Sequence, residues 1–328
     1  MARVHFVNVY PGDCSIIQHN SGRVTMIDIC DGNTETTQMA KFGEAMKLVG
    51  RGGGNFKMCD HNTNPIDYWK SVGAKKIFRF ILTHPDMDHM DGFNRLMDEV
   101  GIWNFWDSGA RKAKPTFGGG QYIEKDWDRF TKVRDKKEEG VTVVTYLAGE
   151  SFAYANKDDK DGSGDALHIL APTKQLLNDP NLEDDVNEGS YVVLYRSSGG
   201  RVLFCGDAHD AAFKHIKENN LADVAGTAVM LAPHHGRDSQ RSYDFLDFIK
   251  PKLTIIGCAP CEHIDYGQWS RRNLDILTSN QAGNIVLDIE GDHIDVFVEN
   301  KSYAMSIHGG DQLVTNDLGY YFLRRIVG

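Results

Sequence analysis

The sequence lacks long apolar runs: no stretch of 18 consecutive apolar residues occurs among its 328 residues. A helix needs about 20 such residues to cross a bilayer, so we expect no membrane-spanning segment and no membrane partner. The first residues, Met1 to Tyr10, also lack the basic start and apolar core of a signal peptide, and they alternate as a strand does. These absences predict a cytoplasmic protein.

Cysteine is too sparse and scattered for a disulfide framework. Only Cys258 and Cys261 have the spacing of a metal-ligand pair, and no second pair accompanies them, which argues against a zinc knuckle. In the reducing cytoplasm we expect free thiols. The six cysteines are Cys14, Cys30, Cys59, Cys205, Cys258 and Cys261.

An excess of positive charge is also missing, because the net charge is −10. This argues against a broad basic surface for nonspecific nucleic-acid binding, but it leaves a local positive groove open. The candidate residues for such a groove are Arg111, Lys112, Lys114, Lys125, Arg129, Lys132 and Arg134.

The chain is long enough to bury a large core, since 41% of its residues are hydrophobic. We expect a single domain over residues 1–328, with an insertion at about 105–140 that is either a solvated helix or a substrate-facing segment. Helical patterns over 38–49, 65–72 and 90–100 alternate with strand patterns.

The loop from Asn156 to Asp165 is rich in Asp, Lys and Gly, but it lacks the glutamate and the spacing of a calcium loop. We expect a surface turn there.

Four potential metal ligands occur within six residues, His84-Pro85-Asp86-Met87-Asp88-His89, directly after the apolar run Ile77–Thr83. Side chains this close cannot all lie on one face of a strand or helix, but a tight loop at a strand end can turn them towards one point. The pattern indicates a cradle for two metal ions.

Two later apolar strands also end in ligand-type residues: Asp207 follows Arg201–Cys205, and His234 and His235 follow Ala228–Ala232. Strand ends at one edge of a sheet are close in space, so these residues can converge on the first group. Two neighbouring divalent cations need an anion between them, and Asp207 is the best-placed candidate.

These motifs resemble the metallo-β-lactamase-fold hydrolases, most closely the hydrolase domain attached to bacterial DNA-uptake (competence) channel proteins. The resemblance rests on Leu82–Gly92 and Ala232–Gly236, with support from Phe6–Ser15, Ile27–Asp28 and Leu203–Ala208. It implies an α/β fold, an αββα four-layer sandwich in which two mixed β-sheets are flanked by helices.

The resemblance also implies roles for individual side chains. His84 would bind one metal, Asp88 and His89 the other, and Asp207 would bridge, with His234 or His235 completing the second site.

The chain departs from the family pattern at two places. Asp86 stands where the family usually has a histidine, and the middle histidine ligand has no counterpart before Tyr191, where Asn187, Glu188 or Ser190 could stand instead. A first site poorer in imidazole favours manganese or magnesium over zinc, so we expect two divalent cations, Zn or Mn, with Mg also open.

Paired cations that activate a water molecule suit phosphodiester hydrolysis, so we expect a metal-dependent phosphodiesterase or nuclease with a nucleic acid or other phosphodiester as substrate. The residues expected to act in catalysis are Asp88, Asp86 and His235, the last two as candidates for proton transfer. Two alternatives stay open. One is an esterase, lactonase or phosphorylcholine-esterase-type hydrolase, and the other is a metal-poor scaffold subunit of a larger complex.

Overall fold

The computed structural model describes residues 1–33, 56–73, 76–118, 120–158, 163–179, 186–257, 259, 263–309 and 312–328. The helix expected over 38–49 and the pair Cys258 and Cys261 lie outside these residues.

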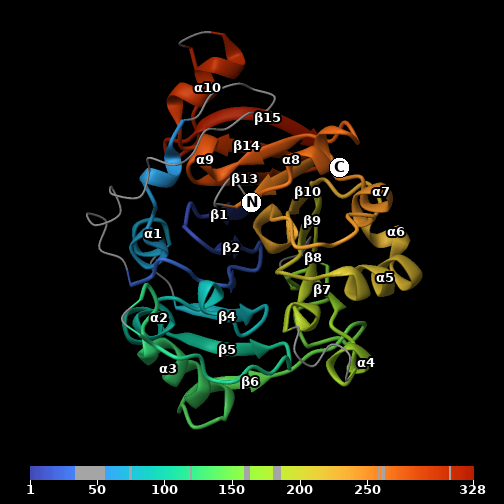
Figure 1. Ribbon diagram of the computed structural model, residues 1–328. Coiled ribbons are helices and arrows are strands. Elements are labelled where there is room, and N and C mark those ends of the chain that lie inside the picture. Colours follow the sequence, from blue (N-terminus) through green and yellow to red (C-terminus); the bar gives the residue numbers. More distant parts are fainter. Residues whose placement is uncertain are drawn as a thin grey trace.

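Two mixed β-sheets form the centre of the molecule (Figure 1). Within the described ranges the first sheet has nine strands in the order β15 (Tyr321–Val327), β14 (His293–Val298), β13 (Ile285–Glu290), β1 (Ala2–Phe6), β2 (Ser15–Gln18), β3 (Val24–Ile27), β4 (Ile77–Leu82), β5 (Ile102–Asp107) and β6 (Thr142–Val144). The second has six, in the order β12 (Ile276–Thr278), β11 (Leu253–Ile256), β10 (Val229–Leu231), β9 (Gly200–Phe204), β8 (Val192–Ser197) and β7 (Leu167–Ala171). Strands β3 to β6 and β9 to β12 run parallel, and the other pairings are antiparallel.

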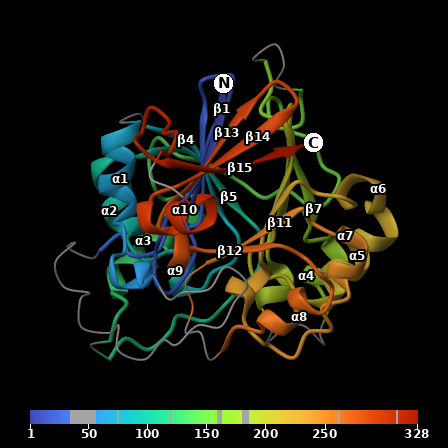
Figure 2. The ribbon, with the colours of Figure 1, turned by 90° about the horizontal axis from the view of Figure 1, so that it is seen from above.

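Helices cover the outer face of each sheet, so the layers run helix, sheet, sheet, helix (Figure 2). The first sheet is covered by α1 (Pro65–Val72), α2 (Phe93–Glu99) and α3 (Glu124–Arg134). The second is covered by α4 (Lys174–Leu177), α5 (Asp210–Asn219), α6 (Leu221–Val224), α7 (Phe245–Ile249) and α8 (Tyr266–Ser270). Near the C-terminal strands lie α9 (Ser279–Ala282) and α10 (Lys301–His308), and short 3₁₀ turns are η2 (Met58–Asp60), η3 (Met87–His89), η4 (Val186–Gly189) and η5 (Pro233–Gly236). The expected αββα sandwich is confirmed.

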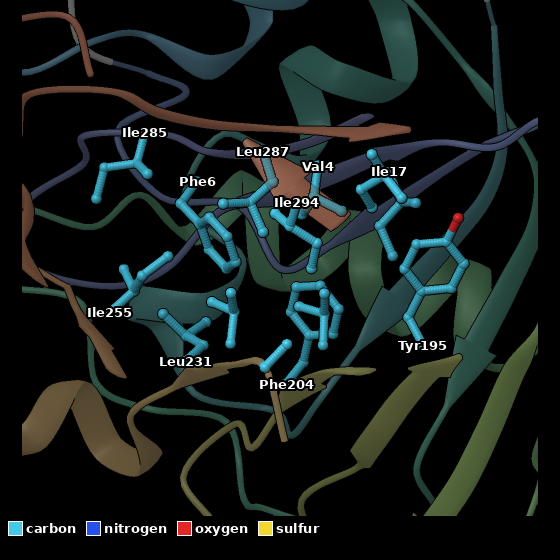
Figure 3. Packing of buried hydrophobic residues seen from close by; sticks show 14 of the residues in the cluster. Val4, Phe6, Ile17, Tyr195, Phe204, Leu231, Ile255, Ile285, Leu287 and Ile294 are labelled. Atoms are coloured by element: carbon cyan, nitrogen blue, oxygen red, sulfur yellow. The ribbon is translucent and has the colours of Figure 1, made fainter. Parts of the chain in front are cut away.

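The main hydrophobic core lies between the two sheets (Figure 3). Val4, Phe6 and Leu287 of the first sheet face Phe204 and Leu231 of the second. Each such fully buried side chain contributes about 1.5 to 3 kcal/mol relative to an exposed one. This core fixes the two sheets against each other and therefore fixes the strand ends that carry the polar loops.

The helix over Pro65–Val72 begins as its sequence predicts. The Asn64 side chain accepts hydrogen bonds from the backbone N–H groups of Ile66 and Asp67, and Pro65 occupies the first helical position. Its buried Trp69 and Ile66 side chains pack into the core between the first sheet and the helices that cover it.

Residues 105–140 contain the end of β5, a loop and the helix α3, which connects the parallel strands β5 and β6. The helix is not solvated on all sides, because Trp127, Phe130 and Val133 are buried against the first sheet's outer core. That the chain is a single domain with an insertion in this segment stays a prediction.

Residues 159–162 of the surface turn expected from Asn156 to Asp165 lie outside the described residues, and the prediction is wrong at its last residue. The Asp165 carboxylate is fully buried, 2.9 Å from Arg79 Nη2 and 2.9 Å from Arg23 Nη2. A buried carboxylate with two guanidinium partners is an anchor rather than a turn residue.

Across the part of the chain that the structure covers, no helix has both the length and the apolar character that crossing a bilayer requires.

Candidate metal centre

Loops at the ends of parallel strands from both sheets meet at one edge of the sandwich. His84 and η3 follow β4 of the first sheet, Asp207 follows β9 of the second, and η5, which contains His234 and His235, follows β10. Ligand sites in α/β proteins form at the carboxyl ends of strands because the loops there are free to converge. The structure thus brings together the three groups of residues that the sequence predicts.

Asp207 lies in the middle of four imidazoles. Its Oδ1 is 3.3 Å from His89 Nε2 and 3.9 Å from His235 Nε2, whereas its Oδ2 is 3.7 Å from His84 Nε2 and 3.5 Å from His234 Nε2. The two oxygens of one carboxylate therefore face two different pairs of histidines. This is the arrangement expected of a carboxylate between two cations.

The two other aspartates of the hexapeptide flank this centre on opposite sides. Asp88 Oδ2 lies 3.5 Å from His235 Nε2, and Asp86 Oδ2 lies 3.7 Å from His84 Nε2. The second Asp86 oxygen, Oδ1, is 2.5 Å from the Lys112 ammonium. The six other residues predicted as metal ligands thus gather around Asp207.

The inward-facing atoms of the centre fit a bound cation. His84 Nε2, His89 Nε2, His235 Nε2 and Asp207 Oδ1 are buried and have no hydrogen-bond partner within the described part of the chain. Buried polar atoms without partners are costly, and a cation held between them removes that cost. Among the described residues, four groups have ligand atoms within 4.8 Å of one another. Three belong to this centre, namely His84/His89/Asp207, Asp88/His89/His235 and Asp13/Asp207/His235, and the fourth, Cys30/Asp31/Asp91, contains none of the predicted ligands.

His89 is oriented by a carboxylate that the sequence analysis gave no role. Asp28 follows β3, and its Oδ2 lies 2.7 Å from His89 Nδ1. The same carboxylate accepts hydrogen bonds from the Thr83 backbone N–H and the Thr83 hydroxyl. A carboxylate on the outer ring nitrogen leaves the other nitrogen directed at a metal.

His235 is held in the same way by Asp13, whose Oδ2 is 3.1 Å from His235 Nδ1. Gly12 allows this approach, because its φ is +132° and an added Cβ would lie 2.2 Å from the Asp88 carbonyl oxygen. The sequence analysis used Phe6–Ser15 only as support for the family resemblance and gave Asp13 no role of its own. The outer ring nitrogen of a metal-binding imidazole needs a hydrogen-bond acceptor. A search for carboxylates near strand ends, where Asp13 and Asp28 both lie, could therefore have found these two residues.

The charges of the centre stabilise one another. Burial lowers the pKa of His89, but Asp207, Asp28 and Asp88 outweigh it and raise that pKa well above its ordinary value. Burial likewise opposes protonation of His235, yet Asp13 and Asp207 raise its pKa to about 10. The pKa of Asp207 is held well below its usual range by His89, His235 and His84, against the opposing effect of burial. The site thus keeps ionised carboxylates next to positive charge, which a divalent cation can also supply.

His234 has a different environment from His235. Burial is the largest of the effects that lower the pKa of His234 to about 4. The His234 side chain is 18% exposed, whereas that of His235 is 1% exposed. With Nε2 towards Asp88 and Asp207 and Nδ1 towards Asp13, His235 has carboxylates at both ring nitrogens, which favours a metal ligand over a mobile proton carrier.

Two residues considered as substitutes for the missing middle histidine are used elsewhere. Both Glu188 oxygens accept backbone hydrogen bonds at the start of α5, from Ala211 and Ala212. The Ser190 hydroxyl accepts the backbone N–H of Asp207.

The lysines and arginines proposed to line a basic groove are mostly paired with carboxylates. Arg111 contacts Asp107, and Lys112 contacts Asp86. The remaining pairs are Lys114 with Glu124 and Asp128, Arg129 with Asp98 and Glu138, Lys132 with Glu138, and Arg134 with Asp135. This pairing reduces the positive potential of the segment, so it gives little support to a long polynucleotide groove.

No family model matches the chain. No curated protein matches it either.

Several solved structures resemble the protein in shape. Igni18, a metallo hydrolase from Ignicoccus hospitalis, is 13% identical with a TM-score of 0.46, and the match covers 88% of this chain and 100% of that one. YhfI from Bacillus subtilis, a metallo-β-lactamase fold protein, is 8% identical with a TM-score of 0.49, again over 88% and 100%. A diphosphatase from the PhnP family is 12% identical with a TM-score of 0.38 and covers 78% and 85%. At these identities and TM-scores, the functional argument rests on the side chains of the site itself.

Proposed function

We propose that this protein is a metal-dependent hydrolase that cleaves phosphodiesters. The observation that carries the proposal is the Asp207 carboxylate, with each oxygen facing a separate pair of imidazoles and with Asp86 and Asp88 on either side. Two bound divalent cations would supply an activated water molecule and would neutralise the charge that develops on the phosphoryl group.

The residues of the chain have distinct parts in this function. His84, Asp86, Asp88, His89, Asp207, His234 and His235 would hold the cations. Asp28 and Asp13 keep the rings of His89 and His235 in place through their outer nitrogens. Two residues were considered for proton transfer. His235 has carboxylates at both nitrogens, and Asp86, beside Lys112 at the edge of the centre, would transfer a proton only if it does not bind a cation.

The paired charges of Arg111 to Arg134 support a small or single-stranded phosphodiester over duplex DNA, because duplex binding depends on many unpaired cations. A nuclease is one form of this proposal, and its two alternatives are an esterase, lactonase or phosphorylcholine-esterase-type hydrolase of small substrates and a metal-poor scaffold subunit. The closeness to competence-channel hydrolase domains and the cytoplasmic location belong to the same proposal and rest on the sequence alone.

The test is hydrolysis by purified protein loaded with manganese, magnesium or zinc. The substrates are bis-p-nitrophenyl phosphate, single-stranded DNA, duplex DNA, RNA and p-nitrophenyl acetate. We expect diester hydrolysis that chelation abolishes, and a loss of at least about 100-fold in the variant Asp88→Ala/His89→Ala. Asp135→Ala, at an exposed ion pair on α3's C-terminal side, is the matched control and should keep full activity.

Three results would contradict the proposal. Unchanged activity in the double variant would remove the site, cleavage of the acetate alone would favour the esterase, and a wild-type protein that binds no cation would favour the scaffold subunit.

A further inference from the structure

A second cluster of charged side chains lies between the two sheets, within β4 rather than at its end. Arg79 of β4 is fully buried, and its Nη2 lies 2.9 Å from Oδ2 of Asp165, which precedes β7 of the other sheet. Arg23 Nη2 lies 2.9 Å from Oδ1 of the same carboxylate. The cluster therefore holds two guanidinium groups and one carboxylate, so one positive charge is in excess. A buried excess charge is costly unless a further group neutralises it.

A neutral histidine adjoins these charges. His19 Nε2 and Arg79 Nη1 both lie 2.8 Å from the Thr25 hydroxyl oxygen, and the His19 ring meets the ring of Tyr195 at one end of the inter-sheet core (Figure 3). Burial lowers the pKa of His19 to about 3, despite the opposing effect of Asp165, so the ring is neutral at pH 7. Because the Thr25 hydroxyl accepts from Arg79, its own proton goes to His19 Nε2, and the ring hydrogen is on Nδ1.

Three buried N–H groups of this cluster have no hydrogen-bond partner among the described residues. They belong to Arg79 Nε, His19 Nδ1 and Trp106 Nε1. The three side chains are at most 4% exposed, and the Arg79 Cζ atom lies 5.1 Å from the centroid of the Trp106 ring. Buried donors without partners are costly, so the cluster needs a hydrogen-bond acceptor.

The acceptors that the described part of the cluster contains are already used. Asp165 accepts hydrogen bonds from the Ser21 hydroxyl and from Arg23 Nε, and it pairs with Arg79. The Thr25 oxygen accepts from Arg79. A water molecule could accept from the three donors, but it would bring two hydrogens that need acceptors of their own. An anion accepts hydrogen bonds without donating any, and it also neutralises the excess charge.

We infer that this cluster binds a small monovalent anion, of the size of chloride, between Arg79, His19 and Trp106. One anion matches the one positive charge in excess. The ion must be small, because the three side chains are buried in the core between the sheets. An anion that binds only the folded protein stabilises it by mass action. The inference is independent of the proposed function, since no residue of the metal centre takes part in it.

The test measures unfolding in urea at pH 7 and fixed ionic strength, with sodium chloride replacing sodium gluconate, whose anion is too large for the cluster. Fixed ionic strength keeps the screening of surface charges constant. We expect the folding equilibrium constant to rise with chloride, approaching about tenfold for each tenfold increase in concentration once the site is filled. Sodium bromide should act in the same way, and anomalous diffraction from bromide-grown crystals should place a bromide ion beside the Arg79 guanidinium.

Arg79→Met removes the buried charge and should abolish the dependence on chloride. Arg3→Met is the matched control, because Arg3 is also buried but its guanidinium pairs with both Asp288 and Asp317. It should keep the wild-type dependence. If Arg79→Met does not fold, His19→Phe takes its place, since it keeps a ring but lacks the Nδ1 hydrogen, and it should weaken chloride binding by at least about tenfold.

Asp165→Asn should change chloride binding in the opposite direction. Removing the carboxylate charge leaves the two guanidinium groups without an anionic partner from the cluster, so chloride should bind at least about tenfold more tightly than in the wild-type protein. A generic salt effect or an ordered water molecule would give no such gain.

A stability that depends on ionic strength alone would overturn the inference, and so would a chloride dependence that Arg79→Met, or His19→Phe in its place, and Asp165→Asn leave unchanged. Bromide found only at the metal centre, or an ordered water molecule beside Arg79 in the bromide-grown crystals, would overturn it as well.

Discussion

Lys112 stands at the point where the loop after β5 reaches the metal centre. Its ammonium lies 2.5 Å from Asp86 Oδ1, and its side chain is 40% exposed, so it borders both the centre and the solvent. Burial raises the pKa of Asp86, but His84 and Lys112 outweigh it and hold that pKa below its usual range. An exposed ammonium beside a cation site is well placed to meet an anionic substrate.

We predict that Lys112→Ala raises KM for bis-p-nitrophenyl phosphate by about fivefold to tenfold, with kcat changed by less than about twofold, because a charge-assisted contact to the phosphoryl group is lost in the ground and transition states alike. Steady-state kinetics measure both constants. Lys114→Ala is the control, since Lys114 is on the same loop but pairs with Glu124 and Asp128 rather than with a residue of the centre. Equal effects in the two variants would mean that Lys112 has no specific part in substrate binding.

At the residue scale, the sequence predicts the proposed ligands better than the carboxylates that orient them. The clustering of His84, His89 and Asp207 was predictable because ligand-type residues follow apolar runs, and their role as ligands stays a proposal. Asp13 and Asp28 were not predictable, because a lone carboxylate near the end of a short strand has the same local pattern as a turn. Only the distances to His235 and His89 give them a role.

At the scale of elements, the loop between β1 and β2 brings Asp13 under the metal centre through the close approach of Gly12 to η3. Gly12→Ala would place a Cβ 2.2 Å from the Asp88 carbonyl oxygen in a backbone conformation with φ of +132°. We expect it to destabilise the protein by about 3 to 5 kcal/mol, combining backbone strain with a steric clash, and to abolish metal-dependent activity. Urea unfolding measures the first effect.

Gly22→Ala provides a matched control for this prediction. Gly22 also has a positive φ, +78°, but an added Cβ would meet no atom within 4 Å. It should cost about 1 kcal/mol from backbone strain alone. If the Gly12 variant had the same free energy of unfolding as the Gly22 variant, the loop would accommodate the added Cβ without losing stability, and the prediction would be contradicted.

Helices and strands could be predicted from the sequence, but how they pack against one another could not. The helical pattern of Pro65–Val72 was confirmed, because a helix cap is a local signal. The buried face of α3 escaped prediction since Trp127, Phe130 and Val133 are diluted by charged residues. The left-handed backbones of His234 and His235 escaped it too, because the hydrogen bond from the His234 N–H to the Gly206 carbonyl oxygen comes from another loop.

At the scale of the whole molecule, Asp165 joins the start of the second sheet to the first. Its carboxylate contacts Arg79 of β4 and also Arg23 and Ser21 near β3. We predict that Asp165→Asn lowers the free energy of unfolding at pH 7 by about 3 to 5 kcal/mol, because it leaves the fully buried Arg79 guanidinium without its counter-charge. Urea unfolding at several pH values is the measurement.

The pH dependence of this effect has a definite sign. Burial raises the pKa of Asp165, but His19, Arg23 and Arg79 outweigh it and hold that pKa below its usual range. A lowered pKa in the folded state gives stability that is present above the unfolded value, about 3.9, and is lost as the pH falls through the folded value. The difference between wild type and variant should therefore shrink below about pH 4. Asp275→Asn, at the exposed pair with Arg324, is the control and should cost less than about 1 kcal/mol at any pH.

The proposed ligand set is divided between the two sheets, so folding and cation binding would occur in a fixed order. Neither sheet alone carries a complete coordination shell, because His84, Asp88 and His89 follow a strand of one and Asp207, His234 and His235 follow strands of the other. A nascent chain that has emerged only as far as β6 lacks Asp207, so under the proposed function tight binding of cations would have to wait until β9 and β10 have docked. Cation binding would then follow docking of the two sheets, and the bound cations would stabilise the docked state against unfolding.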